Sequence, residues 1–336
     1  MKAIRIVGGL MGILLFVGCA TTQVVDLGPN GIAPMKYQGW KRAFRLENDA
    51  ATVVVVPETG RMMYLGLRDG PNVLRNDPGL LGKAPLKAST WTNYGGDWLW
   101  PVAQSRWPGF SEADWPPPEV LRDAAWDAHA WREPDGRQSC LLVRYYGPPV
   151  NAVAMRQFTL DPGKPLVTVY QRMVAVKDAT VPLTLWSITQ IDCPEQVFFP
   201  VRANSSFGKG YTVMMGDAPP GPMTDCDEVV ACDLIKADLS KIGMDAPVPW
   251  IAARKYDVVT VVRAAHPFSG EYPDGGCSLQ LFAMGRGKYA EIETLSPEFH
   301  LRAGESLGNT LTVELLTCHP GTSPCRLADR LRPEEK

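Results

Sequence analysis

The chain has 336 residues, 45% hydrophobic and 21% charged, which is the composition of a globular protein with a substantial core. The formal net charge is −2, and Lys and Arg are not interleaved with aromatic residues, which argues against a nucleic-acid partner. The sequence contains no P-loop, dinucleotide fingerprint or nucleophile elbow, so we expect no cofactor. We also expect no metal, because the four histidines are scattered: His129, His266, His300 and His319.

The N-terminus is typical of a secreted bacterial precursor. "MKAIR" is positively charged, and the apolar "IVGGLMGILLFVG" that follows is short and rich in glycine, so we interpret 1–18 as a signal peptide. The junction "LFVGC" resembles the lipobox of bacterial lipoproteins, which makes Cys19 the expected lipidated residue and membrane anchor. An uncleaved membrane anchor is the alternative. Ala20 then indicates the cell envelope, at the outer membrane facing the periplasm or the exterior, and 19–35 is the expected tether.

Strand patterns dominate the rest of the chain. Apolar and β-branched runs such as "ATVVVVPETGRMMYLGL", "SCLLVRYYG", "PLVTVYQRMVAV" and "NTLTVELL" are separated by Gly, Pro, Asn and Asp. The sequence therefore predicts an all-β protein, a large antiparallel sandwich formed by a single domain over 36–325. Two short segments are predicted to be helical: "EVLRDAAWDAHAW" and the tail "CRLADRLRPEEK", of which 326–336 lies outside the predicted domain.

Seven cysteines remain after Cys19. "CDEVVAC" and "CHPGTSPC" each place two cysteines close enough to close a small disulfide loop, and neither has the spacing of a zinc site. The sequence does not determine the pairing, and one cysteine must be left over.

The segment "KYAEIETLSP" carries the candidate catalytic residues. With the two-residue period of a strand, Tyr289, Glu291 and Glu293 point to one face. The two carboxylates are about 7 Å apart along such a strand, so each charge raises the pKa of the other. A solvated polar face is the alternative interpretation.

The segment "GGDWLWPVAQSRWPGFSEADWPPP" has four tryptophans and no helix or strand period. Indole rings offer flat apolar surfaces to the C–H faces of sugars, and the polar residues between them can bind hydroxyls. We therefore predict a saccharide site here, although the same tryptophans can also close the end of a sandwich core. The expected ligand-binding residues of this segment are Asn93, Asp97, Trp98, Trp100, Gln104, Arg106 and Trp107.

Two stretches resemble a known family. "YAEIETLSPEFHLRAGESLGNTLTVEL" is similar to the C-terminal segment of the aldose 1-epimerase (galactose mutarotase) family, and "TGRMMYLGLRDG" resembles an early strand of that superfamily. The tryptophan segment, with "LWSITQI" and "YPDGG", looks like a relative within it, the domain of unknown function 4380 family. The resemblance implies a mutarotase-like supersandwich with sugars in an open cleft on one sheet. It adds Tyr94, Trp186, Gln190 and Asp274 to the expected ligand-binding residues. It does not imply an established activity.

The resemblance assigns roles only where residues match. Glu293 aligns with the general base of the mutarotases. Tyr94 stands where their sugar-binding histidine would be, and "VPLTLWSITQI" has Trp186 and Gln190 but no histidine to act as the acid. Acid–base chemistry needs a group at both ends of the proton transfer, so the missing histidine weakens the case for mutarotase activity.

Three functions stay open at this point. The first is a carbohydrate-binding envelope lipoprotein without catalysis, which the missing histidine favours. The second is a carbohydrate-active enzyme of the epimerase or polysaccharide lyase type, with Glu293 as its base. The third is a structural envelope lipoprotein. The sequence names neither the sugar nor a reaction.

Overall fold

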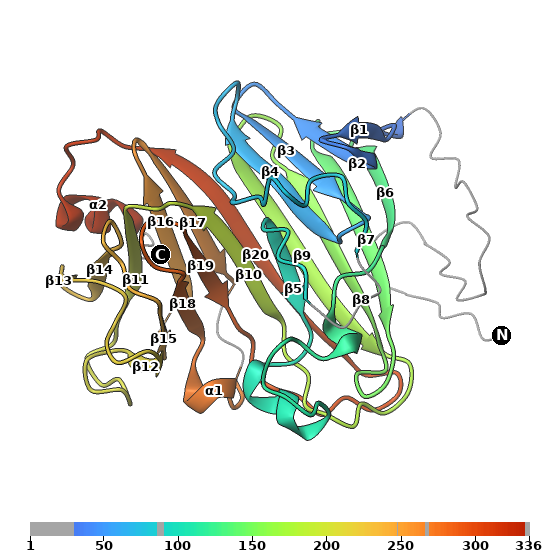
Figure 1. The fold of residues 1–336 in the computed structure, drawn as a ribbon. Coiled ribbons are helices and arrows are strands. Elements are labelled where there is room, and N and C mark those ends of the chain that lie inside the picture. The colour runs from blue at the N-terminus through green and yellow to red at the C-terminus, as the bar shows by residue number, and fades with distance from the viewer. Residues whose placement is uncertain (1–29, 86–90, 247, 266–268, 333–336) are drawn as a thin grey trace.

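The computed structural model describes residues 30–85, 91–246, 248–265 and 269–332, and within them two ten-stranded antiparallel sheets pack face to face (Figure 1). The predicted all-β sandwich is therefore confirmed. The predicted signal peptide and Cys19 lie outside the described residues, so lipidation stays a prediction that fatty-acid labelling of cells would test. Within the described ranges, no helix is long and apolar enough to cross a membrane.

The first sheet carries the candidate site. Its strands, in spatial order, are β1 (Met35–Tyr37), β2 (Trp40–Glu47), β3 (Ala51–Val56), β4 (Arg61–Leu67), β5 (Asp97–Trp100), β10 (Trp186–Asp192), β19 (Tyr289–Thr294), β18 (Leu279–Ala283), β15 (Ser240–Met244) and β12 (Thr212–Met215).

The second sheet backs the first. Its strands, in spatial order, are β13 (Met223–Asp225), β14 (Val229–Asp233), β11 (Gln196–Pro200), β16 (Trp250–Lys255), β17 (Val258–Ala264), β20 (Ser306–Thr317), β9 (Leu166–Ala175), β8 (Ala152–Leu160), β7 (Gln138–Tyr146) and β6 (Asp127–Arg132).

The core lies between the two sheets and follows from the alternation of side chains along each strand. β20 shows the pattern most clearly, because every second residue from Leu307 to Leu315 is buried while the residues that alternate with them are half-buried. β3 differs, since all six of its residues are buried. Its Val54 and Val56 pack away from the main core, in a smaller cluster with other apolar side chains.

The helix predicted over 119–131 is wrong. A short 3-10 helix, η3 (Glu119–Leu121), begins this stretch, and Asp127–Arg132 forms strand β6 instead. Pairing with β7 buries Ala128 and Ala130, so tertiary contacts override the local helix preference of this alanine-rich run. The backbone of Ile32, placed in the tether by the sequence, also hydrogen-bonds to β6 at Ala130.

The C-terminal helix is present, as α2 (Pro324–Leu331). Its buried side chains Leu327, Ala328 and Leu331 pack against Phe198 and Trp250 of the second sheet. The other α-helix of the described residues is the single turn α1 (Pro273–Gly276).

One disulfide joins the two cysteine-rich motifs, Cys226 to Cys325. Neither motif closes its own small loop, because Cys226 and Cys325 meet where α2 packs beside β13 and β14. The free cysteines of the described residues are Cys140, Cys193, Cys232, Cys277 and Cys318.

Candidate functional site

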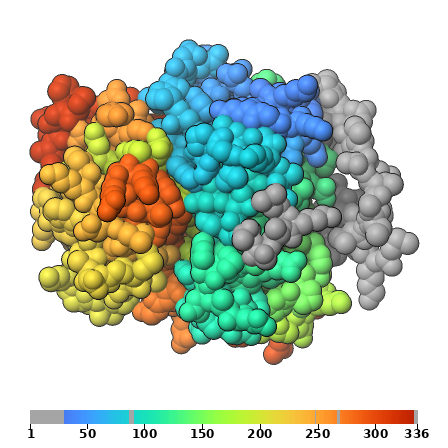
Figure 2. All heavy atoms as spheres, in the orientation of Figure 1, coloured from blue at the N-terminus to red at the C-terminus, as the bar shows by residue number. Residues whose placement is uncertain are grey.

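The candidate site lies on the outer face of the first sheet, the face turned away from the second sheet. On β19, Ala290 and Ile292 belong to the core between the sheets. Tyr289, Glu291 and Glu293 therefore point outward together, as the period of a strand requires. Segments far apart in sequence meet here, because the β18–β19 region (orange) lies directly beside the 70–100 region (cyan) in Figure 2.

Glu293 is fully buried and held by two donors. The indole Nε1–H of Trp186 donates to its Oε2 at 2.6 Å, and Lys241 Nζ donates to the same oxygen at 3.1 Å. The other carboxylate oxygen, Oε1, has no hydrogen-bond partner among the described residues. Burial raises the pKa of Glu293 above its usual value, and the charge of Lys241 opposes that rise.

Glu291 is the second carboxylate of the face. Gln190 Nε2 donates to Glu291 Oε1 at 2.5 Å, and Gln190 in turn accepts a bond of 3.3 Å from Arg75. Burial, with the nearby charge of Glu293, raises the pKa of Glu291 to about 7. This carboxyl therefore changes its charge near neutral pH.

Tyr289 occupies the end of the face. Its hydroxyl accepts a hydrogen bond of 3.1 Å from Asn93 Nδ2, and the guanidinium of Arg75 lies 4.9 Å from the centre of its ring. Burial and the charge of Glu291 raise the pKa of Tyr289 to about 12, so the phenol stays protonated at neutral pH. It can then donate its proton in a hydrogen bond to a ligand.

A further group of polar side chains lies at β18, at α1 and at η2. Its members are Gln280, Asp274, Arg106 and Glu298. Gln280 pairs with Glu293 in the sheet and donates to Asp274 Oδ2 at 2.6 Å, while its Oε1 has no partner among the residues described. Arg106, in the 3-10 helix η2 (Gln104–Gly109), forms a bidentate pair with Glu298 and is half exposed. Gln104, also predicted to bind ligand, begins η2 and is partly exposed.

The tryptophans of the predicted saccharide site form a packed cluster. Trp98, Trp100, Trp107 and Trp186 are each 5% exposed or less, and their rings meet at centroid distances of 5.1–6.2 Å. Most of this cluster is therefore core. This agrees with the alternative interpretation, in which these tryptophans close the end of a sandwich core. Trp115, at 52% exposure, is the tryptophan that presents most surface to solvent.

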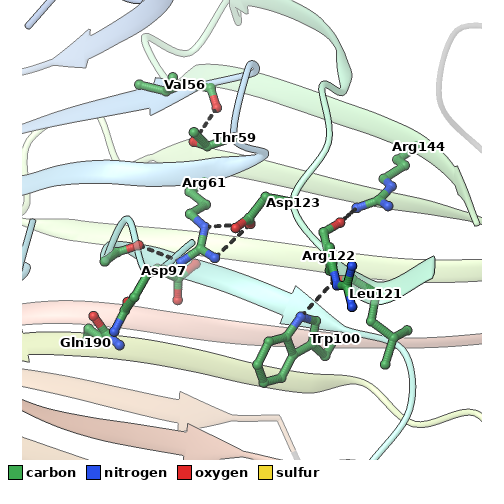
Figure 3. A network of polar contacts seen from close by, with 12 residues as sticks. Val56, Thr59, Arg61, Asp97, Trp100, Leu121, Arg122, Asp123, Arg144 and Gln190 are labelled. Carbon is green, nitrogen blue, oxygen red and sulfur yellow. Dashed lines mark hydrogen bonds and ion pairs between the residues drawn. The ribbon is translucent and has the colours of Figure 1, made fainter. Parts of the chain in front are cut away.

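Polar anchors hold the cluster in place (Figure 3). Trp100 Nε1 donates to the carbonyl of Leu121 at 3.1 Å, and the buried guanidinium of Arg61 bonds Asp123 at 2.7 Å. Arg61 also lies 4.1 Å from the ring centroid of Trp98, whose own Nε1 has no hydrogen-bond partner in the described part of the chain. The cluster thus supports Trp186, which in turn positions the Glu293 carboxylate.

Two predicted ligand-binding residues lie elsewhere. Asp97 points toward the second sheet, where it is 2% exposed and bonds Arg156 of β8 at 2.7 Å and Thr189 at 2.8 Å. Alternation on β5 explains this, because Trp98 and Asp97 must face opposite sides. Tyr94 is buried in the apolar cluster of β3, where burial raises the pKa of its hydroxyl to about 12. Asp97 is thus turned away from Glu293, whereas Tyr94 packs with Val54 and Val56 on the side of β3 away from the main core.

Sequence reasoning missed Lys241, Gln280 and Arg75. Lys241 and Gln280 lie on β15 and β18, and cross-strand register brings both to the carboxylates of β19. The available signal was the strand period: in "CSLQLFAMG", Gln280 is the polar residue between Leu279 and Leu281. Arg75 follows β4 in an irregular segment, where the sequence offers no period. No three His, Cys, Asp or Glu side chains of the described residues gather as a metal site requires.

The raised pKa of Glu291 predicts a pH-dependent stability. Its folded-state pKa of about 7 exceeds the ordinary value of 4.5, so between these values the folded state binds more protons than the unfolded state. Its contribution to stability is full below pH 4.5 and is lost as the pH rises through 7. Denaturant unfolding of the parent and of Glu291→Gln from pH 4 to 8 should show the parent losing stability relative to the variant. A constant difference between them would contradict this.

Comparison with known proteins places the fold. No family model matches the sequence, and no curated protein matches it either. A galactose mutarotase-like protein from Lactobacillus casei matches with a TM-score of 0.52 and 11% identity, over 82% of this chain and 100% of that one. A galactose 1-epimerase from Lactobacillus acidophilus matches with a TM-score of 0.52 and 12% identity, over 86% of this chain and 99% of that one.

A TPR-domain containing protein from Parabacteroides distasonis also matches, with a TM-score of 0.57 and 16% identity, over 87% of this chain and 50% of that one. At these identities the likeness shows the fold alone, a mutarotase-like sandwich. Membership of the domain of unknown function 4380 family stays a prediction.

Proposed function

We propose that this protein binds a saccharide on the outer face of the first sheet, over Glu293. The observation that carries the proposal is a group of buried polar atoms without hydrogen-bond partners among the described residues: Glu293 Oε1, Gln280 Oε1 and Trp98 Nε1. They belong to β5, β19 and β18, and Ile188 of the intervening strand β10 completes one outward row across the four strands. Trp98 pairs with Ile188, Ile188 with Glu293, and Glu293 with Gln280. Buried polar atoms are nearly always satisfied, so such a group needs a ligand or water.

Sugar hydroxyls suit these atoms chemically. Each hydroxyl donates one hydrogen bond and accepts others, so it can donate to the oxygens of Glu293 and Gln280 and accept from the indole of Trp98. Lys241, at 3.1 Å, balances the negative charge of Glu293, and Asp274, bonded to Gln280, adds a further negative charge beside them. The site therefore disfavours an acidic sugar and suits a neutral polyol. The fold is consistent with this, because two of the matched structures described above are named for galactose.

The test is a titration of the purified protein with neutral mono- and oligosaccharides, followed by calorimetry and by tryptophan fluorescence. Binding beside the packed tryptophans should change their emission as well as release heat. A protein that binds none of these sugars would contradict the proposal and leave the structural envelope component as the better interpretation.

A second candidate, a sugar-converting enzyme, is favoured by one specific observation. Glu291 has a pKa of about 7 and shares its face with the buried Glu293, and carboxyls tuned toward neutral pH suit acid–base catalysis. The described residues include no histidine at this face, so Lys241 and Glu291 would be the nearest groups able to supply a proton to a ring oxygen. Polarimetry of freshly dissolved anomers of a bound sugar distinguishes the two candidates: an enzyme accelerates the approach to equilibrium, and a binding protein does not.

A further inference from the structure

The outer face continues beyond Glu293 into a second group of side chains. Phe282 pairs with Glu291 in the sheet and is half-buried, with its ring centroid 6.1 Å from that of Tyr289. Beside them, Asn93 uses its Nδ2 to bond the hydroxyl of Tyr289. The proposed contacts with Glu293 and Gln280 use none of these three residues.

These residues have the composition of a sugar subsite. The half-buried Phe282 ring offers an apolar surface to the C–H face of a pyranose. Asn93 Oδ1 is buried and accepts no hydrogen bond from the residues described, so it is available to a ligand hydroxyl. Arg75 is already engaged, because it bonds Asp77 at 3.0 Å and the carbonyl of Asn93 at 2.9 Å. We therefore expect this group to bind a neutral sugar ring and not an acidic one.

The two groups are too far apart for one ring. Tyr289, which Asn93 bonds, is four residues from Glu293 on β19, about 13 Å at roughly 3.4 Å per residue. A single pyranose is shorter than this distance, whereas two or three linked rings extend along it. Phe282 lies between these ends, two residues or about 7 Å along β18 from Gln280. Partnerless acceptors occur at both ends, at Asn93 and at Glu293, so both ends require a ligand or water.

We propose that the site is built for an oligosaccharide, with one neutral ring over Glu293 and Gln280 and a following ring over Phe282 and Asn93. This rests on the proposed saccharide binding and adds the class of ligand. Each ring occupies its own subsite, so the second ring adds affinity without changing the contacts of the first. Chain length, and not only the identity of the sugar, then decides binding.

The experiment is calorimetry with three series: glucose, cellobiose and cellotetraose; glucose, maltose and maltotetraose; and N-acetylglucosamine, chitobiose and chitotetraose. In a series that binds, we expect the disaccharide to bind at least about tenfold more tightly than the monosaccharide. Phe282→Ala should remove most of that gain and leave monosaccharide affinity unchanged. Asn93→Ala is a second variant with the same expected selectivity, and Asn204→Ala, at an exposed asparagine, is the matched control.

Each outcome decides the proposal. Equal affinity for mono-, di- and tetrasaccharides would overturn it and leave saccharide binding itself intact. The proposal would also fail if Phe282→Ala and Asn93→Ala weakened monosaccharide and disaccharide binding equally. Absence of binding in all three series would overturn both this inference and the proposed function.

Discussion

Replacing Asp97 by alanine should lower the free energy of unfolding by about 3–5 kcal/mol, the range for breaking a buried ion pair. Arg156, which is fully buried, would lose the carboxylate that faces it at 2.7 Å. Thr189 would lose its acceptor as well. The cost is large because a guanidinium left without its counter-charge between the sheets cannot regain water.

Denaturant unfolding measures this effect, and Asp192→Ala is the matched control. Asp192 also pairs with a cation, Lys255 at 2.5 Å, but its side chain is 42% exposed. Exposed pairs contribute about 0–1 kcal/mol, so the control should unfold almost like the parent. If Asp97→Ala unfolded like the control, the network between the sheets would not have the structural role assigned to it. Replacing Asp97 and Arg156 together by apolar residues should cost less than Asp97→Ala alone, because no charge is then left buried.

Glu293→Gln should weaken saccharide binding by about 1.5–3 kcal/mol, or roughly 10- to 150-fold, the range for a hydrogen bond to a charged group. Glutamine keeps the shape of the side chain. Its amide oxygen can still accept the hydrogen bond that Trp186 Nε1 donates to Glu293 Oε2 at 2.6 Å in the parent. Circular dichroism should therefore show a folded protein. If the protein is an enzyme, turnover should fall further, by about 10²–10⁴-fold, because a general base is lost.

Calorimetry with the best-binding sugar checks this result, and Glu291→Gln is the control. Glu291 shares the outer face with Glu293 but already accepts a hydrogen bond from Gln190. Normal binding by Glu293→Gln, together with impaired binding by Glu291→Gln, would contradict the proposal. It would show that the ligand binds at Glu291 and not at Glu293.

Local patterns in the sequence were enough to assign several structural elements. The two-residue period of "KYAEIETLSP" assigned Tyr289, Glu291 and Glu293 to one face, because side chains alternate in any strand whatever its neighbours. Repeated apolar runs between turn residues were enough to predict the antiparallel sandwich. The terminal helix α2 followed from its own composition.

Contacts between side chains that are distant in sequence depend on how the strands are arranged in the folded protein. Lys241 reaches Glu293 across 52 residues of sequence, and the cysteines of the disulfide are separated by 99, because strand order and register set these contacts. Burial decided the rest. From sequence alone, the tryptophan-rich segment can be interpreted either as a ligand-binding surface or as core. In the folded protein Trp98, Trp100 and Trp107 are buried, so these three belong to the core. Residues 127–132 likewise became a strand because β7 offered backbone pairing that an isolated helix could not match.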